Sequence, residues 1–173
     1  MFTLRDATPK DAAAIAAIYR HYVLESVDTF EEIPPDETAI AARIAGTLGA
    51  GFPWLVAESG GAVVGYAYAG LYRARSAYRF TVENSVYVAH THSRQGIGRA
   101  LMQDVIARCA AKGHRQMMAV ISGPMDCPSV KMHAALGFKP VGFLPAVGLK
   151  FGKWIDVVEM QLPLGEGNAT IPR

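Results

Sequence analysis

The chain has 173 residues, which is enough for one domain with a sizeable hydrophobic core and too few for two full domains. Hydrophobic residues make up 51% and charged residues 18% of the chain, a composition that excludes a disordered protein. The formal net charge of +2 provides no broad cationic field, so we expect no nucleic-acid partner.

The first twelve residues, MFTLRDATPKDA, carry charges and turn-forming residues where a secretory signal peptide has its apolar segment. The longest weakly polar run, residues 61–72, is shorter than the roughly 20 residues that cross a bilayer. We therefore expect a cytoplasmic protein with no membrane partner. Cys109 and Cys127 are expected to be free thiols, because cytosolic domains of this size need no disulfide.

Two helices are predicted in the first fifty residues. The sequence TPKD at residues 8–11 has a capping hydroxyl, a proline at the first helical position and a carboxylate at the third. Apolar residues then recur at three- and four-residue spacing as far as Val23, which is typical of one buried helix face. A second helix is expected over residues 36–48. The loop between them, residues 27–35, holds one conspicuous aromatic residue, Phe30.

From residue 54 the pattern changes to the alternation that is typical of strands. Residues 54–58 and 62–72 are predicted to form a hairpin about a Ser-Gly-Gly turn, and a longer strand is expected over residues 80–88. This places Glu83 in the middle of a strand. Alternation predicts that one face of the strand carries Phe80, Val82, Val86 and Val88, and that the other carries Thr81, Glu83, Ser85 and Tyr87.

The second half of the chain alternates helices and strands. We expect a helix over residues 97–112, a strand over 117–121, a helix over 128–136, and strands over 138–143 and 155–162. This order predicts an α/β fold with one mixed central β-sheet flanked by helices. A single domain is expected over residues 1–164, followed by a loose C-terminal tail over residues 165–173.

Two glycines lie where the strand over residues 80–88 leads into the next helix, in the sequence RQGIGRAL at residues 94–101. Glycine lets backbone N–H groups approach a ligand closely, and the positive end of the helix dipole favours phosphate. The sequence is not a dinucleotide GxGxxG motif, because Leu101 occupies the last position, and it lacks the GK[ST] of a nucleoside-triphosphate loop. It therefore suits a phosphate cradle of another kind, with a simple tight turn as the alternative.

The sequences ENSVYV, RQGIGRAL and PSVKMHAALGF resemble the acetyl-CoA-binding core of the GNAT superfamily of N-acetyltransferases. Further stretches, IYRHYVLES, PWLVAE, GYAYAG and VGLKFGKWIDVVEMQL, are similar to the branch that acetylates phosphinothricin and methionine sulfoximine. The similarity extends over roughly residues 3–164. It implies a single-domain GNAT-like fold over residues 1–164, acetyl-CoA as co-substrate and a homodimer.

The resemblance also implies which residues bind acetyl-CoA. The strand around Val86–Val88 would lend backbone hydrogen bonds to the pantetheine arm, and the amides of Gly96–Ala100 would hold the pyrophosphate. The expected binding residues are Val86, Tyr87, Val88, Arg94, Gln95, Gly96, Ile97, Gly98, Arg99, Ala100, Asp126 and Ser129. Two positions depart from the family: Ser93 replaces a Gln or Arg, for which Arg94 is placed to compensate, and Asp126 replaces an Asn whose amide would donate a hydrogen bond.

Glu83 is the predicted catalytic base. An amine attacks a thioester in its neutral form, and an amino group with a pKa of roughly 8 is mostly protonated at pH 7, so a positioned carboxylate accelerates the reaction. On spacing alone Glu83 is a solvated strand residue or an ion-pair partner, and the resemblance of TVENSVYV to the family favours the base.

His133 lies where many family members place a tyrosine that protonates the leaving thiolate, a position that is histidine in this branch. The resemblance implies three alternatives for it: a general acid, part of a proton relay, or a packed helix residue.

Arg73, Arg75 and Arg79 lie within seven residues, just before Glu83. A guanidinium binds a carboxylate through two hydrogen bonds, which suits an acceptor that resembles an amino acid. We favour Arg75 and Arg79 for this contact, with surface charge as the alternative for some of the three. Phe30 and Tyr78 are candidates for the walls of the acceptor pocket, with core packing as the alternative.

The resemblance and these residues together imply an enzyme that transfers acetyl directly from acetyl-CoA to the α-amine of a small amino-acid-like substrate, such as phosphinothricin or methionine sulfoximine or sulfone. A backbone amide near Val88 would polarise the thioester carbonyl. The alternatives are a GNAT enzyme for a protein N-terminus, lysine or polyamine, and a non-catalytic acyl-CoA sensor. No metal is expected, because His90 and His92 lack a third ligand.

Overall fold

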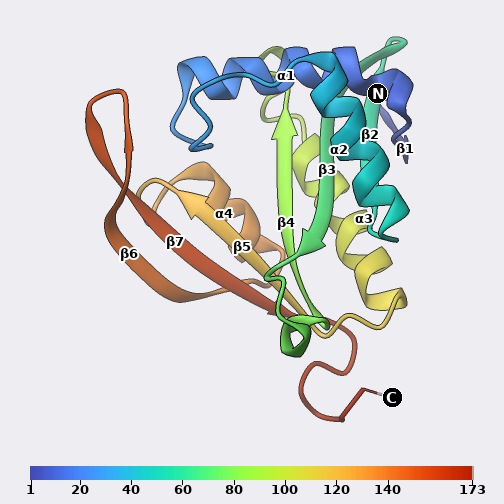
Figure 1. The fold of residues 1–173 in the computed structure, drawn as a ribbon, viewed down its shortest axis with the longest axis vertical. Coiled ribbons are helices and arrows are strands. Elements are labelled where there is room, and N and C mark those ends of the chain that lie inside the picture. The colour runs from blue at the N-terminus through green and yellow to red at the C-terminus, as the bar shows by residue number, and fades with distance from the viewer. Residues whose placement is uncertain (173) are drawn as a thin grey trace.

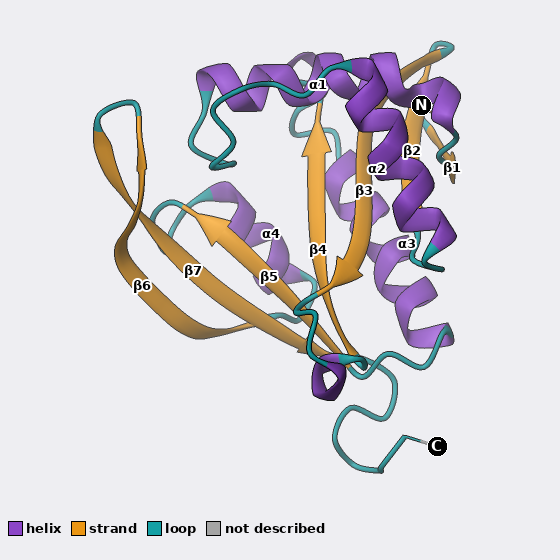
Figure 2. Ribbon diagram, in the orientation of Figure 1, coloured by secondary structure: helices purple, strands orange, loops and turns teal. Residues whose placement is uncertain are grey.

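A seven-stranded mixed sheet runs through the computed structural model, which describes residues 1–172 (Figures 1 and 2). The strands are β1 (Thr3–Asp6), β2 (Trp54–Ser59), β3 (Ala62–Leu71), β4 (Thr81–Val88), β5 (Gln116–Ser122), β6 (Lys139–Lys150) and β7 (Lys153–Pro163). Their spatial order is β1-β2-β3-β4-β5-β7-β6. β4 and β5 pair in parallel, and the other neighbouring pairs are antiparallel.

Four α-helices cover the two faces of this sheet: α1 (Ala12–Glu25), α2 (Glu37–Gly49), α3 (Ile97–Ala111) and α4 (Pro128–Ala135). The alternation of β2 divides the core between the faces. Trp54 and Val56 pack with α1 and α2, whereas Leu55 and Ala57 pack in the cluster that contains α3 and Val130 of α4. The predicted α/β class and mixed sheet are confirmed.

All the predicted helices and strands are present, but one strand was not predicted and two others are longer than predicted. β1 is a four-residue edge strand that pairs with β2, and its sequence TLRD is too short to show a period. The last two strands form a hairpin that extends to Lys150 and begins again at Lys153, beyond the predicted limits. Pro145, Gly148 and the register shift after Leu144 conceal the alternation of β6.

The segment after residue 164 makes ordered contacts with the domain. Arg115 forms an ion pair with Glu166 at 3.0 Å, and the Gly167 amide donates to the Leu164 carbonyl. Arg173, the last residue of the predicted tail, lies outside the described residues. The boundary at residue 164 stays a prediction.

Two further expectations concern cysteines and membrane spans. Cys109 is buried in the core and Cys127 is partly exposed, and both are free thiols as predicted. Within residues 1–172, no helix is long and apolar enough to cross a membrane.

The loop between α1 and α2 packs against the hairpin of β6 and β7. Lys150, which is only 2% exposed, donates to the Thr29 carbonyl at 2.7 Å, and burial lowers the pKa of its amine. The ring of Phe30 lies directly over Gly148, so that a Cβ at this glycine would overlap the ring. Because glycine has no side chain, the ring of Phe30 can lie directly against the backbone at position 148.

We predict that Gly148→Ala lowers the free energy of unfolding by about 1–3 kcal/mol, because the added Cβ overlaps the ring of Phe30 and the ring must move away. Gly142→Ala, in the same strand, is the matched control. Its added Cβ would meet the flexible carboxylate of Glu159, and we expect a change within ~0.5 kcal/mol. Urea unfolding followed by circular dichroism measures both. Equal stability of the two variants would show that Phe30 is not held in this way.

Candidate functional site

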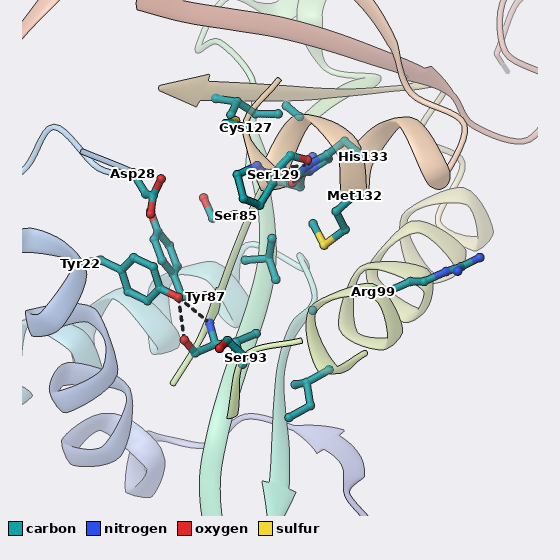
Figure 3. A pocket seen from close by; sticks show the side chains of 18 of the residues that line it. Tyr22, Asp28, Ser85, Tyr87, Ser93, Arg99, Cys127, Ser129, Met132 and His133 are labelled. Carbon is teal, nitrogen blue, oxygen red and sulfur yellow. Dashed lines mark hydrogen bonds between the residues drawn. The ribbon is translucent and has the colours of Figure 1, made fainter. Parts of the chain in front are cut away.

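A cavity of about 480 Å³ opens where β4 and β5 separate (Figure 3). The two strands pair from Thr81 with Gln116 to Glu83 with Met118, and they diverge beyond these residues. One side of the cavity is formed by the second half of β4 and the start of α3, and the other by the end of β5 and the start of α4. The break in parallel pairing therefore creates the opening.

Most of the residues that were predicted to bind acetyl-CoA line this cavity. These are Val86, Tyr87, Val88, Arg94, Gly96, Ile97, Gly98, Arg99 and Ser129. Gln95, Ala100 and Asp126 are outside its lining, so the structure does not bring them to the wall. The sequence analysis did not identify Tyr22, Asp28 and Met132 as lining residues, because their contacts with the cavity come from helix and loop packing and have no local motif.

The start of α3 presents free backbone donors to the cavity. Gly96 precedes the helix with φ of +80°, a left-handed conformation that favours glycine. The first N–H groups of a helix have no partner within it, and they carry its positive dipole end. A Cβ at Gly98 would lie 3.3 Å from Met132 Sδ and 3.5 Å from Val88 Cγ2, so a larger side chain would fill the cavity. The geometry suits a bound phosphate group.

Tyr22 of α1 also lines the cavity and contacts the free edge of β4. Its hydroxyl donates to the Val88 carbonyl at 2.6 Å, and the Val88 amide donates back to the hydroxyl at 3.4 Å (Figure 3). Burial raises the pKa of this phenol. Tyr22 therefore supplies the hydrogen bonds that β5 would make if the sheet were continuous here.

A second hollow of about 380 Å³ lies farther along the same strands. It is lined by Tyr72, Arg73, Arg75, Tyr78, Thr81, Gln116, Met118 and Gln161. Along β4, Thr81 lines this hollow, and Asn84 and Ser85 line the first cavity. Glu83 lies between them in the strand and belongs to neither lining. Glu83 is half-buried, and burial raises the pKa of its carboxyl while nearby Arg73 opposes that shift.

The three arginines have different surroundings. Arg73 lies over the ring of Tyr72 and donates to its hydroxyl at 3.2 Å, while Arg75 lies just before the short helical turn Ser76–Tyr78. Arg79 is outside both linings: its guanidinium lies over Phe80 and donates to the Ser76 carbonyl. Phe30 is also outside both linings, against Gly148.

His133 is buried in α4 with both ring nitrogens close to oxygen atoms. Its Nε2 lies 3.0 Å from Asn84 Oδ1, and its Nδ1 lies 2.8 Å from the Ser129 carbonyl. The ring meets Phe138 edge to face. Burial lowers the pKa of His133, and the bond with Ser129 opposes that shift.

His90 and His92 lie in the loop before α3. His90 stacks on His21 at a ring distance of 4.5 Å, and His92 lies 2.9 Å from the Thr91 hydroxyl. Among residues 1–172, no group of three His, Cys, Asp or Glu side chains is arranged to hold a metal ion.

Comparison with known proteins agrees with this geometry. Residues 4–158 match the family model described as an acetyltransferase (GNAT) domain. The chain is 49% identical over 170 residues to a phosphinothricin N-acetyltransferase from Alcaligenes faecalis, covering 98% of this chain and 86% of the relative. It is 38% identical to an L-methionine sulfoximine/L-methionine sulfone acetyltransferase from Salmonella typhimurium, covering 95% of each chain.

A solved structure extends the likeness to the whole fold. The crystal structure of a GNAT superfamily phosphinothricin acetyltransferase from Sinorhizobium meliloti, in complex with acetyl-CoA, superposes with a TM-score of 0.95 and 48% sequence identity. The match covers 99% of this chain and 93% of that one. The predicted resemblance is thus confirmed, and the chain belongs to the GNAT acetyltransferase family.

Proposed function

We propose that the protein transfers the acetyl group of acetyl-CoA to the α-amine of a small amino-acid-like acceptor, of the phosphinothricin or methionine sulfoximine and sulfone type. Its membership of the GNAT family and the activities of its relatives support this function. The observation that carries the proposal is the place of Glu83 on β4, between a cavity that begins at a helix N-terminus and a hollow lined by arginines.

Acetyl-CoA would lie in the first cavity. The backbone of Val86–Val88 would bind its pantetheine arm, and the amides of Gly96–Gly98 would hold its pyrophosphate, with Arg94 adding positive charge. Both segments line the cavity, and the helix dipole favours a phosphate at this end. The donor supplies the acetyl group as a thioester, so no covalent acyl-enzyme is required.

The acceptor would lie in the second hollow, with its carboxylate on Arg75 and Arg73 and with Tyr78 as a wall. Glu83 then takes a proton from the ammonium group, directly or through a water. A base works best when its pKa lies near the working pH, and burial raises the pKa of the Glu83 carboxyl in that direction. A backbone amide near Val88 would polarise the thioester carbonyl, and His133 would supply the proton that the departing thiolate needs.

The function is tested by thiol release at fixed acetyl-CoA across a panel of amines. We expect phosphinothricin or methionine sulfone to exceed spermidine and a short peptide in kcat/KM. Arg75→Ala should reduce the preference for the free amino acid over its amide by ten- to a hundredfold, which is about 1.5–3 kcal/mol for a charged hydrogen bond. Arg20→Ala, an exposed arginine on α1, is the control. Faster reaction with the polyamine or peptide would replace this acceptor class with the alternative one.

The variant Glu83→Gln tests two properties of this carboxyl: its role as the base, through kcat, and its effect on the free energy of unfolding. We expect kcat to fall by about 10² or more with the affinity for acetyl-CoA nearly unchanged. The folded-state pKa of Glu83 is raised, so its ionised form destabilises the fold at neutral pH and this cost disappears below the ordinary value of 4.5. The variant should therefore be more stable than the wild type at pH 7 and equally stable at acid pH. Unchanged turnover would exclude Glu83 as the base.

We also propose that the enzyme is a homodimer that associates through the hairpin of β6 and β7. This hairpin exposes a row of large apolar side chains, and Trp154 is 68% exposed in the single chain. The row comprises Val141, Phe143, Leu144, Val147, Leu149, Phe151 and Trp154. Exposed apolar patches of this kind mark interaction surfaces, and a second copy would bury them.

Sedimentation velocity tests the dimer. The wild-type protein should have a sedimentation coefficient that corresponds to twice the monomer mass. Trp154→Glu should raise the dissociation constant of the dimer at least tenfold, because it places a charge in an apolar contact. Ile171→Glu is the control, since Ile171 is equally apolar and 91% exposed but lies in the C-terminal segment. A wild-type monomer at micromolar concentration would refute the dimer.

The cytoplasm is the proposed location. Both cysteines are free, which agrees with a reducing compartment. The proposed donor, acetyl-CoA, must also be present where the enzyme works.

A further inference from the structure

The side-chain amide of Asn84 lies between the two halves of the first cavity and contacts His133. We propose that Asn84 determines which proton His133 gives up, and that this proton passes through the hydroxyl of Ser129 to the departing thiolate of CoA. This inference rests on the proposed acetyl transfer. It makes Asn84 a positioning residue and Ser129 a catalytic residue.

Asn84 continues the pairing of β4 and β5 at the point where their backbones separate. It is the residue after Glu83, which pairs with Met118, and it is 6% exposed. Its Nδ2 donates to the Met118 carbonyl at 2.9 Å. A carbonyl oxygen only accepts, so the nitrogen of the amide must face Met118 and the oxygen must face the other way.

This orientation decides the state of one nitrogen of His133. Asn84 Oδ1 lies 3.0 Å from Nε2, and an amide oxygen only accepts hydrogen bonds. A hydrogen on Nε2 satisfies this oxygen, both in the neutral ring and in the cation, whereas a neutral ring with its hydrogen on Nδ1 would leave the oxygen facing a bare nitrogen. With the reverse orientation of the amide, two buried oxygen atoms would face each other at Met118, which leaves both without a donor.

The other nitrogen is then the place where the proton arrives and leaves. Nδ1 lies 2.8 Å from the Ser129 carbonyl and 3.4 Å from the Ser129 hydroxyl. In the cation Nδ1–H donates to the carbonyl. In the neutral ring Nδ1 has a lone pair, and the hydroxyl is the group beside it that can donate. Burial is the larger effect and lowers the pKa of His133, so it favours the neutral ring, while the Ser129 carbonyl opposes this by stabilising the cation that carries the proton.

The hydroxyl of Ser129 also connects His133 to the reaction. Both residues belong to the cavity lining, but His133 is only 2% exposed, and Ser129 precedes it by one helical turn and is less deeply buried (Figure 3). When the carbon–sulfur bond breaks, its electron pair stays on sulfur. The thiolate takes the Ser129 hydroxyl proton, and the serine oxygen takes the Nδ1 proton of His133. CoA leaves as the thiol, and His133 is left neutral with its hydrogen on Nε2.

The tautomer is measured without any turnover. In the wild-type protein labelled with ¹⁵N-histidine, NMR above the pKa of His133 should show a protonated Nε2 and a bare Nδ1. In Asn84→Ala the neutral ring should gain a measurable population with the hydrogen on Nδ1, since the Ser129 carbonyl then favours that form. A wild-type neutral ring protonated on Nδ1 would overturn the assignment.

The relay is measured by a double-mutant cycle in thiol release. Ser129→Ala and His133→Gln should each lower kcat tenfold or more, and the double variant should be no slower than His133→Gln alone, because both residues serve one proton. Ser129→Thr, which keeps the hydroxyl, should restore kcat to within about threefold of wild type. Lys131→Ala, an exposed residue of α4, is the control.

The outcomes separate this inference from the proposed function. An active wild-type enzyme whose Ser129→Ala variant keeps full kcat overturns the relay and leaves the acetyl transfer intact. Losses that multiply in the double variant also overturn it. A wild-type protein that releases no thiol with any amine overturns the proposed function, and the tautomer measurement would then still decide the part that concerns Asn84.

Discussion

The site depends on one constraint, the end of backbone pairing between β4 and β5 after Glu83 and Met118. Unpaired backbone groups inside a protein are costly, so a sheet cannot simply part in its middle. Side chains satisfy the groups nearest the break: Asn84 bonds the Met118 carbonyl from within the sheet, and Tyr22 bonds the Val88 carbonyl from α1. These two side chains allow an open cavity to exist beside a stable sheet.

The same strand would serve both proposed substrates because its side chains alternate between faces. Asn84 is directed towards His133 and α4, whereas Tyr87 packs against Tyr19 and Tyr22 of α1. Glu83 belongs to the second series and is close enough to Arg73 for its pKa to respond. An acyl donor entering at the break and an acceptor lying over the arginines would therefore meet on β4.

The sequence is informative where structure depends on neighbours in the chain. The helices, the long strand over residues 80–88 and the glycine-rich start of α3 were all predicted, because capping, periodicity and turn chemistry are local. β1 was not predicted because its four residues are ordered by pairing with β2, about fifty positions away. Within the site, Tyr22 and Asn84 were missed for the same reason: their partners Val88 and His133 are distant in sequence. Gln95 and Ala100 lie outside the cavity lining, and a sequence motif does not tell which of its residues face a cavity.

Two polar side chains, Lys150 and Ser122, hold distant parts of the chain together around the site. Lys150 is placed at the carbonyls of Thr29 and Tyr22, where α1 ends, so the hairpin of β6 and β7 is fixed to the same helix whose Tyr22 hydroxyl contacts Val88. Ser122, the last residue of β5, bonds the Val27 carbonyl at 2.6 Å and anchors the loop from a second side. Through these bonds the apolar hairpin and the end of β5 are both held to α1 and the loop that follows it, and α1 in turn bonds the strand that is proposed to hold the thioester.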